Sequence, residues 1–200
     1  MSRPVVNPGR LIWSGEHWIN YLRLPGATNN NAMVSLYYTR YSAAGEGSVA
    51  LVDIAGEDGL CGVCTDAPAL ADFILENMIR GSGNPFDREL PLYPARIERG
   101  GDIRWAPNWT IEAEGHNIVS TWSSLQPPVI AEGPAPVFSE GRDFFTLLVF
   151  TDVASIAMDG RSVPGKPYLH EGWKKSIGGA RSSCVFALSE TMIETYRDGQ

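Results

Sequence analysis

One stretch of the chain decides the fold: residues 105–122 read WAPNWTIEAEGHNIVSTW. Apolar and polar residues alternate along 109–114, as they do in a β-strand whose two faces meet different environments. Gly115-His116 then predicts a type II′ turn with two central residues. In the resulting hairpin Trp109 lies opposite Trp122, and the two indoles stand side by side on one face.

Two interpretations of this indole pair are open. Large amphipathic rings, each with an N–H to satisfy, suit the wall of a cavity that holds a flat ligand. Ordinary core packing is the alternative, because most aromatic clusters in proteins are core. Under the first interpretation Trp105, Trp109 and Trp122 contact a substrate, while Thr110 and Glu112 point away from it.

Strand signals dominate the rest of the chain. Short runs of β-branched and aromatic residues, separated by glycine-rich turns, predict strands over residues 11–24, 33–41, 49–54, 95–105, 109–122, 144–158 and 182–188. Inside 95–105, the hydrophobic pattern favours a three-residue loop at Gly100-Gly101.

Two segments predict helix. Residues 67–80 have apolar side chains at helical spacing, which indicates a helix of about four turns. Asp66 or Thr65 is expected to cap its start, and Gly81 to end it. A second, short helix is predicted near the C-terminus, over 190–196.

These elements indicate a mainly β fold in one domain, residues 1–200. Open sheet edges invite aggregation, so we expect the strands to close into an antiparallel, meandering β-barrel. The Pro/Gly-rich segment 125–142 is expected to form a long loop across one barrel end, where it can act as a lid. Barrels of about eight strands are either filled by side chains or hold one small ligand. The many Trp and Tyr residues at alternating positions favour the ligand-holding form.

Three features carry a resemblance to a known superfamily. They are the meander, an early aromatic strand containing Gly15-Glu-His-Trp18, and a last strand, 182–188, preceded by Arg181 and followed by the predicted helix. On these features the chain resembles the calycin superfamily of lipocalin-like barrels. The resemblance implies a calycin-like barrel that binds or transforms small hydrophobic molecules. Lipocalins carry Gly-x-Trp where this chain has one more residue, so no lipocalin functional residue is transferred to it.

Charge and composition exclude several classes of partner. The net charge is −7 and only Lys174-Lys175 are adjacent cations, whereas phosphate backbones require clustered Lys and Arg. We therefore expect no nucleic-acid partner. The most apolar window, 144–150, is far shorter than the ~20 residues of a membrane helix, so no membrane partner is expected. The N-terminus lacks the apolar run of an export signal, which favours a cytoplasmic location.

Cys61-Gly-Val-Cys64 is the one formal motif match, and such a pair can be a redox dithiol or half a zinc site. Asp66 near the start of the next helix disfavours a thiolate, and zinc would need two further ligands, of which only Cys184 and single histidines are candidates. Structural cysteines are the favoured interpretation. Glycine motifs for nucleotides, catalytic serine motifs and regular metal-ligand spacings are missing, so neither a nucleotide nor a metal cofactor is expected.

The three histidines are the natural acid/base candidates, because imidazole titrates near neutral pH. His17 and His170 are the candidate catalytic residues, with Trp18 and Trp173 near them as candidate substrate contacts. His116 falls at the predicted turn tip, where exposure to solvent is the usual state.

Polar residues dispersed among aromatics complete the candidate set. Tyr38 and Arg40 share one face of a strand, so both are candidate catalytic groups, and Arg40 can clamp an anion or a carbonyl. The alternative is that Arg40 is simply solvated at the barrel mouth. Tyr37 is a further candidate substrate contact, and Lys174 a further candidate catalytic group.

The sequence therefore predicts a small-molecule enzyme that works by acid/base chemistry, in the lyase, isomerase or hydratase class. Its substrate is expected to be an aromatic or polycyclic/terpenoid compound. The alternative is a non-catalytic carrier barrel for a small hydrophobic ligand, and a third possibility is an interaction module whose aromatic surface forms a homo-oligomer. An enzyme requires at least two titratable groups that converge on one ligand, whereas a carrier needs only groups that orient it.

Overall fold

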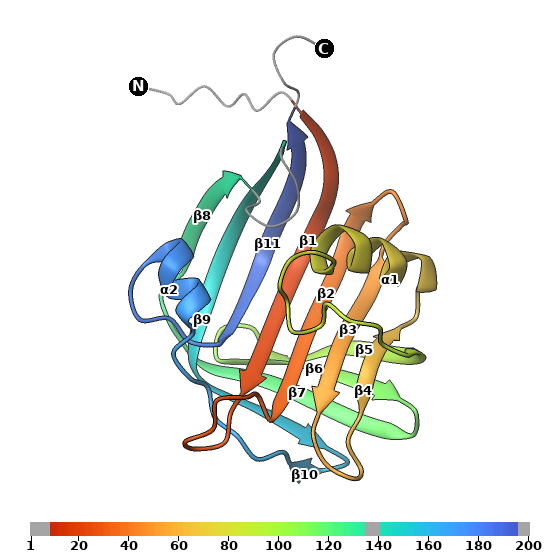
Figure 1. Cartoon of the computed structure of the whole chain (residues 1–200), viewed down its shortest axis with the longest axis vertical. Coiled ribbons are helices and arrows are strands. Elements are labelled where there is room, and N and C mark those ends of the chain that lie inside the picture. The colour runs from red at the N-terminus through yellow and green to blue at the C-terminus, as the bar shows by residue number, and fades with distance from the viewer. Residues whose placement is uncertain (1–8, 135–140, 196–200) are drawn as a thin grey trace.

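The computed structural model describes residues 9–134 and 141–195, which are mainly β-strand. Within these residues, eleven strands and two α-helices follow one another in the order shown in Figure 1. Their bounds are β1 Gly9–Leu22, β2 Ala32–Ser42, β3 Gly47–Ile54, β4 Cys61–Thr65, α1 Pro68–Ile74, β5 Leu92–Asp102, β6 Ala106–Ala113, β7 His116–Leu125, β8 Val129–Pro134, β9 Arg142–Met158, β10 Arg161–Ser162, α2 Glu171–Ile177 and β11 Cys184–Thr195.

Nine of the strands close into a barrel, in the order β9-β11-β1-β2-β3-β4-β5-β6-β7 and back to β9. The prediction of a mainly β, closed barrel is confirmed. Strand β9 is long enough to serve two partners: residues 142–150 pair with β11 and residues 151–158 pair with β7, which closes the circuit. Strands β8 and β10 lie outside the circuit and pair with β9.

The expectation of antiparallel pairing throughout is wrong at one place, because β4 and β5 are parallel. Parallel neighbours cannot be joined by a tight turn and need a crossover connection. Helix α1 lies within that connection, so the helix that the sequence predicts is also part of the crossover that makes parallel pairing possible.

The predicted helix over 67–80 is confirmed in position. It consists of α1 followed by a π-helical segment, Leu75–Ile79. Pro68 occupies the first turn, where its missing N–H costs no hydrogen bond, and the Thr65 hydroxyl accepts a hydrogen bond from the Ala67 N–H at 2.9 Å. Gly81, with φ of +73°, follows the end of the helix.

Two predictions for the C-terminal half of the chain are wrong. The segment expected to be a helix over 190–196 continues strand β11 as far as Thr195, and the second helix is instead α2. The segment expected to be a long loop over 125–142 contains β8, which pairs with β9; residues 135–140 lie outside the described residues. In both cases a neighbouring strand supplies backbone partners that the local sequence does not reveal.

The hairpin around Gly115 also differs from the prediction. The turn residues are Glu114 and Gly115, with φ of +50° and +80°, and Trp109 pairs with Ser120 instead of Trp122. Two consecutive positive φ values define a type I′ turn, whose twist matches that of the strands. The shift is two residues, so both tryptophans still face the barrel interior.

The β5–β6 connection differs as well. Strand β5 runs through Gly100-Gly101, Asp102 pairs with Ala106, and residues 103–105 form the turn. Trp105 is therefore 71% exposed at a hairpin tip, apart from the other tryptophans of its stretch.

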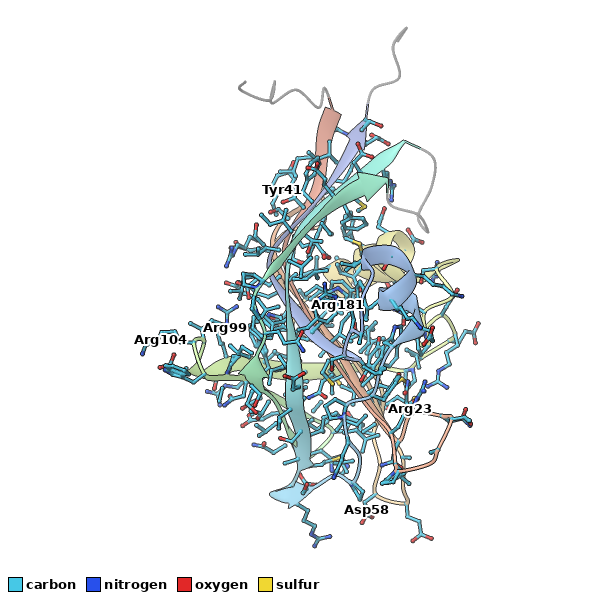
Figure 2. The ribbon with its side chains drawn as sticks, turned by 90° about the vertical axis from the view of Figure 1, so that its left-hand side faces the viewer. Arg23, Tyr41, Asp58, Arg99, Arg104 and Arg181 are labelled. Atoms are coloured by element: carbon cyan, nitrogen blue, oxygen red, sulfur yellow. The ribbon has the colours of Figure 1, made fainter. Side chains whose placement is uncertain are left out.

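The wall made of β9, β11, β1, β2, β3 and β4 has two covered faces (Figure 2). Strands β5, β6 and β7 lie on one side of the wall, and α1 and α2 lie on the other side. Two hydrophobic clusters result, one inside the barrel and one between the wall and the helices. The buried hydrophobic residues of β1 therefore belong to one of two separate environments.

Candidate functional site

The centre of β1 places two candidate groups on opposite faces. Glu16 and Trp18 face the barrel interior, whereas His17 faces the side covered by the helices. Gly15 precedes them at an irregularity of the strand pairing, where an added Cβ would collide with the Tyr38 carbonyl oxygen. Only glycine therefore allows β1 and β2 to approach so closely at this point.

The barrel interior is packed with aromatic rings at the level of Trp18. Its indole is stacked on Phe186 at 4.3 Å between centroids and contacts the edges of Trp122 and Trp109 at 5.1 and 5.9 Å. Trp18, Trp122 and Phe186 are fully buried. These rings fill the barrel at this level, so the interpretation as core packing describes them better than a cavity wall does, and they do not form an exposed aromatic surface.

Below this layer Asn20 joins opposite walls of the barrel. Its side-chain NH₂ donates to Ser120 Oγ at 2.9 Å and to the Ser155 carbonyl at 3.0 Å. Its side-chain oxygen accepts from the Cys184 thiol at 3.4 Å. A buried amide with all these partners ties β1 to β7 and β9.

A charged cluster lies beside the tryptophans at one end of the barrel. The Glu16 carboxylate is buried and accepts hydrogen bonds from Arg40 on β2, from Arg99 on β5 and from the Trp18 indole N–H. The two arginine side chains are 54% and 39% exposed. Burying a carboxylate without partners is costly, so the arginines are what makes Glu16 tolerable here.

Aromatic rings support the second guanidinium of this cluster. The Arg99 Cζ atom lies 4.8 Å from the centroid of Trp109 and 5.5 Å from that of Tyr38. Both distances are within the range of cation–π attraction. We call Glu16, Arg40, Arg99, Tyr38 and Trp109 the mouth cluster. It contains three of the sequence-predicted candidates, Arg40, Tyr38 and Trp109.

On the other face of β1, the His17 ring lies beside three other side chains. Its Nε2 shares a hydrogen bond of 2.9 Å with Ser35 Oγ, and its ring is stacked on Tyr37 with centroids 4.1 Å apart. Its Nδ1 lies 3.7 Å from Glu190 Oε1 on β11, longer than a hydrogen bond. The side chains of His17 and Glu190 keep 15% and 11% of their exposure. We call these four residues the histidine cluster.

The phenols of Tyr37 and Tyr21 are buried on the same face of the wall as the histidine cluster. Desolvation by burial, with the charges of Tyr21 and Glu190 adding to it, raises the pKa of Tyr37 well above its usual value. Burial also raises the pKa of Tyr21 strongly, against a smaller opposing effect of its hydrogen bond to Ser35. Both phenols therefore stay protonated throughout the physiological range.

One buried hydroxyl next to this cluster has no hydrogen-bond partner. It is Thr146 Oγ1 on β9, and Thr146 is paired with Glu190 across the two strands. Among the described residues the only other buried side-chain polar atom without a partner is Trp109 Nε1, in the mouth cluster. The two unsatisfied atoms thus lie one at each cluster, where a ligand or ordered water would satisfy them.

The remaining candidates around α2 lie apart from His17. His170 caps α2 by accepting a hydrogen bond from the Trp173 N–H at 3.3 Å, and burial, together with the charge of Arg23, lowers its pKa. Trp173 packs against Phe150, and Lys174 is exposed and lies 3.6 Å from Glu171. The structure gives His170 a capping role, and Lys174 points into solvent.

His116 and the cysteines have structural surroundings. His116 Nδ1 lies 2.8 Å from Asp159 at the edge of the barrel. Cys61 and Cys64 are three residues apart on β4, so their thiols face opposite sides of the strand. Burial raises the pKa of Cys64 and of Cys184 to about 12, which removes both as thiolate nucleophiles. No group of three or more metal-ligating side chains occurs within 9–134 and 141–195.

Sequence reasoning missed four members of these clusters: Glu16, Arg99, Ser35 and Glu190. Arg99 carries a recognisable signal, because it shares a strand face with Ala95 and Ile97 and so places a charge on the inward side. Glu190 was hidden by the incorrect helix prediction.

No protein-family model matches the chain, and none of the curated proteins is significantly similar to it in sequence. No helix of the described residues has the length and apolar character that crossing a membrane requires.

Proposed function

We propose that the protein is a small-molecule enzyme that transfers protons by means of His17, in the lyase, isomerase or hydratase class. The observation that carries the proposal is the placement of Nδ1 and the Glu190 carboxylate 3.7 Å apart, with both side chains partly exposed. Two titratable groups that converge on one point are what an enzyme requires and a carrier does not.

Each neighbour of His17 has a distinct role in this proposal. Ser35 is fully buried and engages Nε2, so it orients the ring and leaves Nδ1 as the nitrogen that a ligand can reach. Glu190 stabilises the imidazolium that forms when His17 takes a proton. Tyr37 fixes the plane of the ring by stacking. Ser35 has no exposed surface, which argues against a nucleophilic serine.

The surroundings favour an apolar substrate. The hydrophobic residues on this face of the wall, to which the histidine cluster belongs, are mainly aliphatic and aromatic, among them Ile12, Ile19 and Phe144. An aromatic or polycyclic compound with an acidic C–H or O–H fits such walls, because apolar surroundings strengthen the interaction between the imidazole and the carboxylate.

Proton exchange tests the proposal even while the product of the reaction is unidentified. Aromatic and polycyclic ketones, enols and unsaturated compounds are first ranked by the increase in melting temperature that they cause. Those that bind are incubated with the protein in D₂O, and deuterium incorporation is followed by mass spectrometry. We expect His17→Gln to slow exchange by roughly 10²- to 10⁴-fold, the usual contribution of a general acid/base.

His116→Gln is the matched control, because His116 also lies beside a carboxylate but at the barrel edge. It should exchange deuterium at the wild-type rate. Ligands that bind while exchange stays at the rate of the solution without protein would show a carrier instead of an enzyme. Equal rates in His17→Gln and wild type would remove His17 from the reaction.

A further inference from the structure

The mouth cluster carries more positive charge than its carboxylate neutralises. Arg40 and Arg99 both bond to Glu16, so the three groups together have one net positive charge. A guanidinium offers five N–H donors, and within the described residues each of these arginines uses only its Nη2. Most of the donors at this end of the barrel are therefore available to an acceptor from solution.

The carboxylate of Glu16, in contrast, has both of its oxygens engaged. One oxygen accepts from Arg40, and the other accepts from Arg99 and from the Trp18 indole. Because Glu16 is held from β1 while the arginines come from β2 and β5, the carboxylate fixes two guanidiniums side by side. Glu16 thus acts as a positioning residue, and an incoming anion is not attracted to it but to the arginines.

A second, independent observation lies in the same cluster. Trp109 is 3% exposed and its Nε1 has no hydrogen-bond partner among the described residues. A buried donor without an acceptor costs free energy, and an oxygen atom supplied at this end of the barrel would recover it. The Trp109 ring also lies closer to the Arg99 guanidinium than the rings of Trp18 and Tyr38 do.

The aromatic side chains of the region favour a flat ligand. Tyr38 and Trp109 form an aromatic floor under Arg99. Figure 2 shows Arg99 beside the wall of long strands, whereas Arg104 lies at the tip of the projecting β5–β6 hairpin. The two arginines of the mouth cluster are partly exposed, so a ligand can reach them from solvent without displacing a helix.

We propose that the mouth cluster is a binding site for a small aromatic carboxylate, gripped by Arg40 and Arg99. The planar fork of a guanidinium matches a carboxylate through two parallel hydrogen bonds, and one net positive charge balances one carboxylate. The aromatic part of the ligand stacks on Tyr38, which is partly exposed, whereas Trp109 is buried against Arg99. This site lies on the opposite face of β1 from His17, so it is independent of the proposed enzyme activity.

Isothermal titration calorimetry with 1-naphthoate tests the site in the full-length protein. We expect one saturable site per chain, with at least about tenfold weaker binding of the neutral 1-naphthamide, which lacks the charge. Arg99→Lys keeps a cation opposite Glu16 but loses the fork, and should weaken naphthoate binding by about tenfold or more. Arg104→Lys, on the same hairpin and bonded to Asp102, should bind as wild type does.

Melting curves followed by circular dichroism show whether each variant is folded. If the Arg99→Lys variant is not folded, Arg40→Lys on strand β2 provides the same comparison. Absence of saturable naphthoate binding would overturn the proposal, and so would equal affinities of Arg99→Lys and Arg104→Lys. Inorganic phosphate that displaces naphthoate at equal concentration would overturn the assignment of a carboxylate ligand.

Discussion

The two faces of β1 use buried charge in opposite ways. In the mouth cluster both oxygens of the Glu16 carboxylate are engaged, by two arginines and an indole N–H. In the histidine cluster the Glu190 carboxylate lies 3.7 Å from its imidazole, too far for a hydrogen bond. A saturated carboxylate, with both oxygens hydrogen-bonded, fixes the positions of its partners. A loosely paired carboxylate can still take part in proton transfer.

The largest expected effect concerns the packing that supports the mouth cluster. Trp18→Ala removes a fully buried indole that contacts three other rings, and should lower the free energy of unfolding by about 3–5 kcal/mol. Trp105→Ala, at the exposed hairpin tip, should change it by less than about 0.5 kcal/mol. Urea denaturation measures both. Similar losses in the two variants would contradict a filled barrel interior.

An intermediate effect compares the two carboxylates directly. Glu16→Gln replaces charge-assisted hydrogen bonds to two arginines and should cost about 1.5–3 kcal/mol of unfolding free energy. Glu190→Gln removes only a long contact to His17 and should cost less than about 1 kcal/mol. Urea denaturation at pH 7 measures the loss of unfolding free energy in both variants. A larger loss for Glu190→Gln would reverse the distinction between the saturated and the loosely paired carboxylate.

The smallest effect concerns the phenols beneath His17 and appears only at alkaline pH. Because burial raises the pKa of Tyr37 in the folded protein, its contribution to stability is complete below about pH 10, where it is protonated in both states. As pH rises above that value the unfolded chain ionises first, and stability falls by up to ~1.4 kcal/mol per pH unit for each such group.

Tyr37→Phe should therefore flatten the decrease of melting temperature between about pH 10 and 11.5, while Tyr41→Phe should leave its slope unchanged. Tyr41 is the appropriate control because it is an exposed phenol one strand position beyond Arg40. Equal slopes in wild type and Tyr37→Phe would show that Tyr37 ionises in the folded protein as it does in the unfolded chain.

The local patterns predicted most strands of the barrel. Runs of β-branched and aromatic residues identified β1, β2, β3, β6, β7 and β9, and helical spacing identified the segment over 67–80. These signals failed for β8 and for the end of β11, since both are strands mainly because β9 lies beside them. Pairing is a long-range property, and short strands carry little signal of their own.

The candidate site was predicted in part, and the reason is visible in particular residues. Periodicity alone places Trp18, Trp109 and Trp122 on inward faces, and it places His17 on the opposite face of its strand from the residues next to it in sequence. It could not show that Ser35 and Glu190 meet His17, because these partners are 18 residues away along the chain and on the last strand. The type I′ turn at Glu114-Gly115 likewise changed the partner of Trp109 without changing its face.

The sequence by itself determined which side chains share a face within a regular strand, since side chains alternate between the two faces with a two-residue period. Only the tertiary structure decided which inward side chains meet. Glu16 joins Arg40 across 24 residues and Arg99 across 83, and Asn20 reaches Ser120 across 100. These contacts depend on the closure of β7 onto β9 and on the crossover through α1, and neither is encoded in any local pattern of residues.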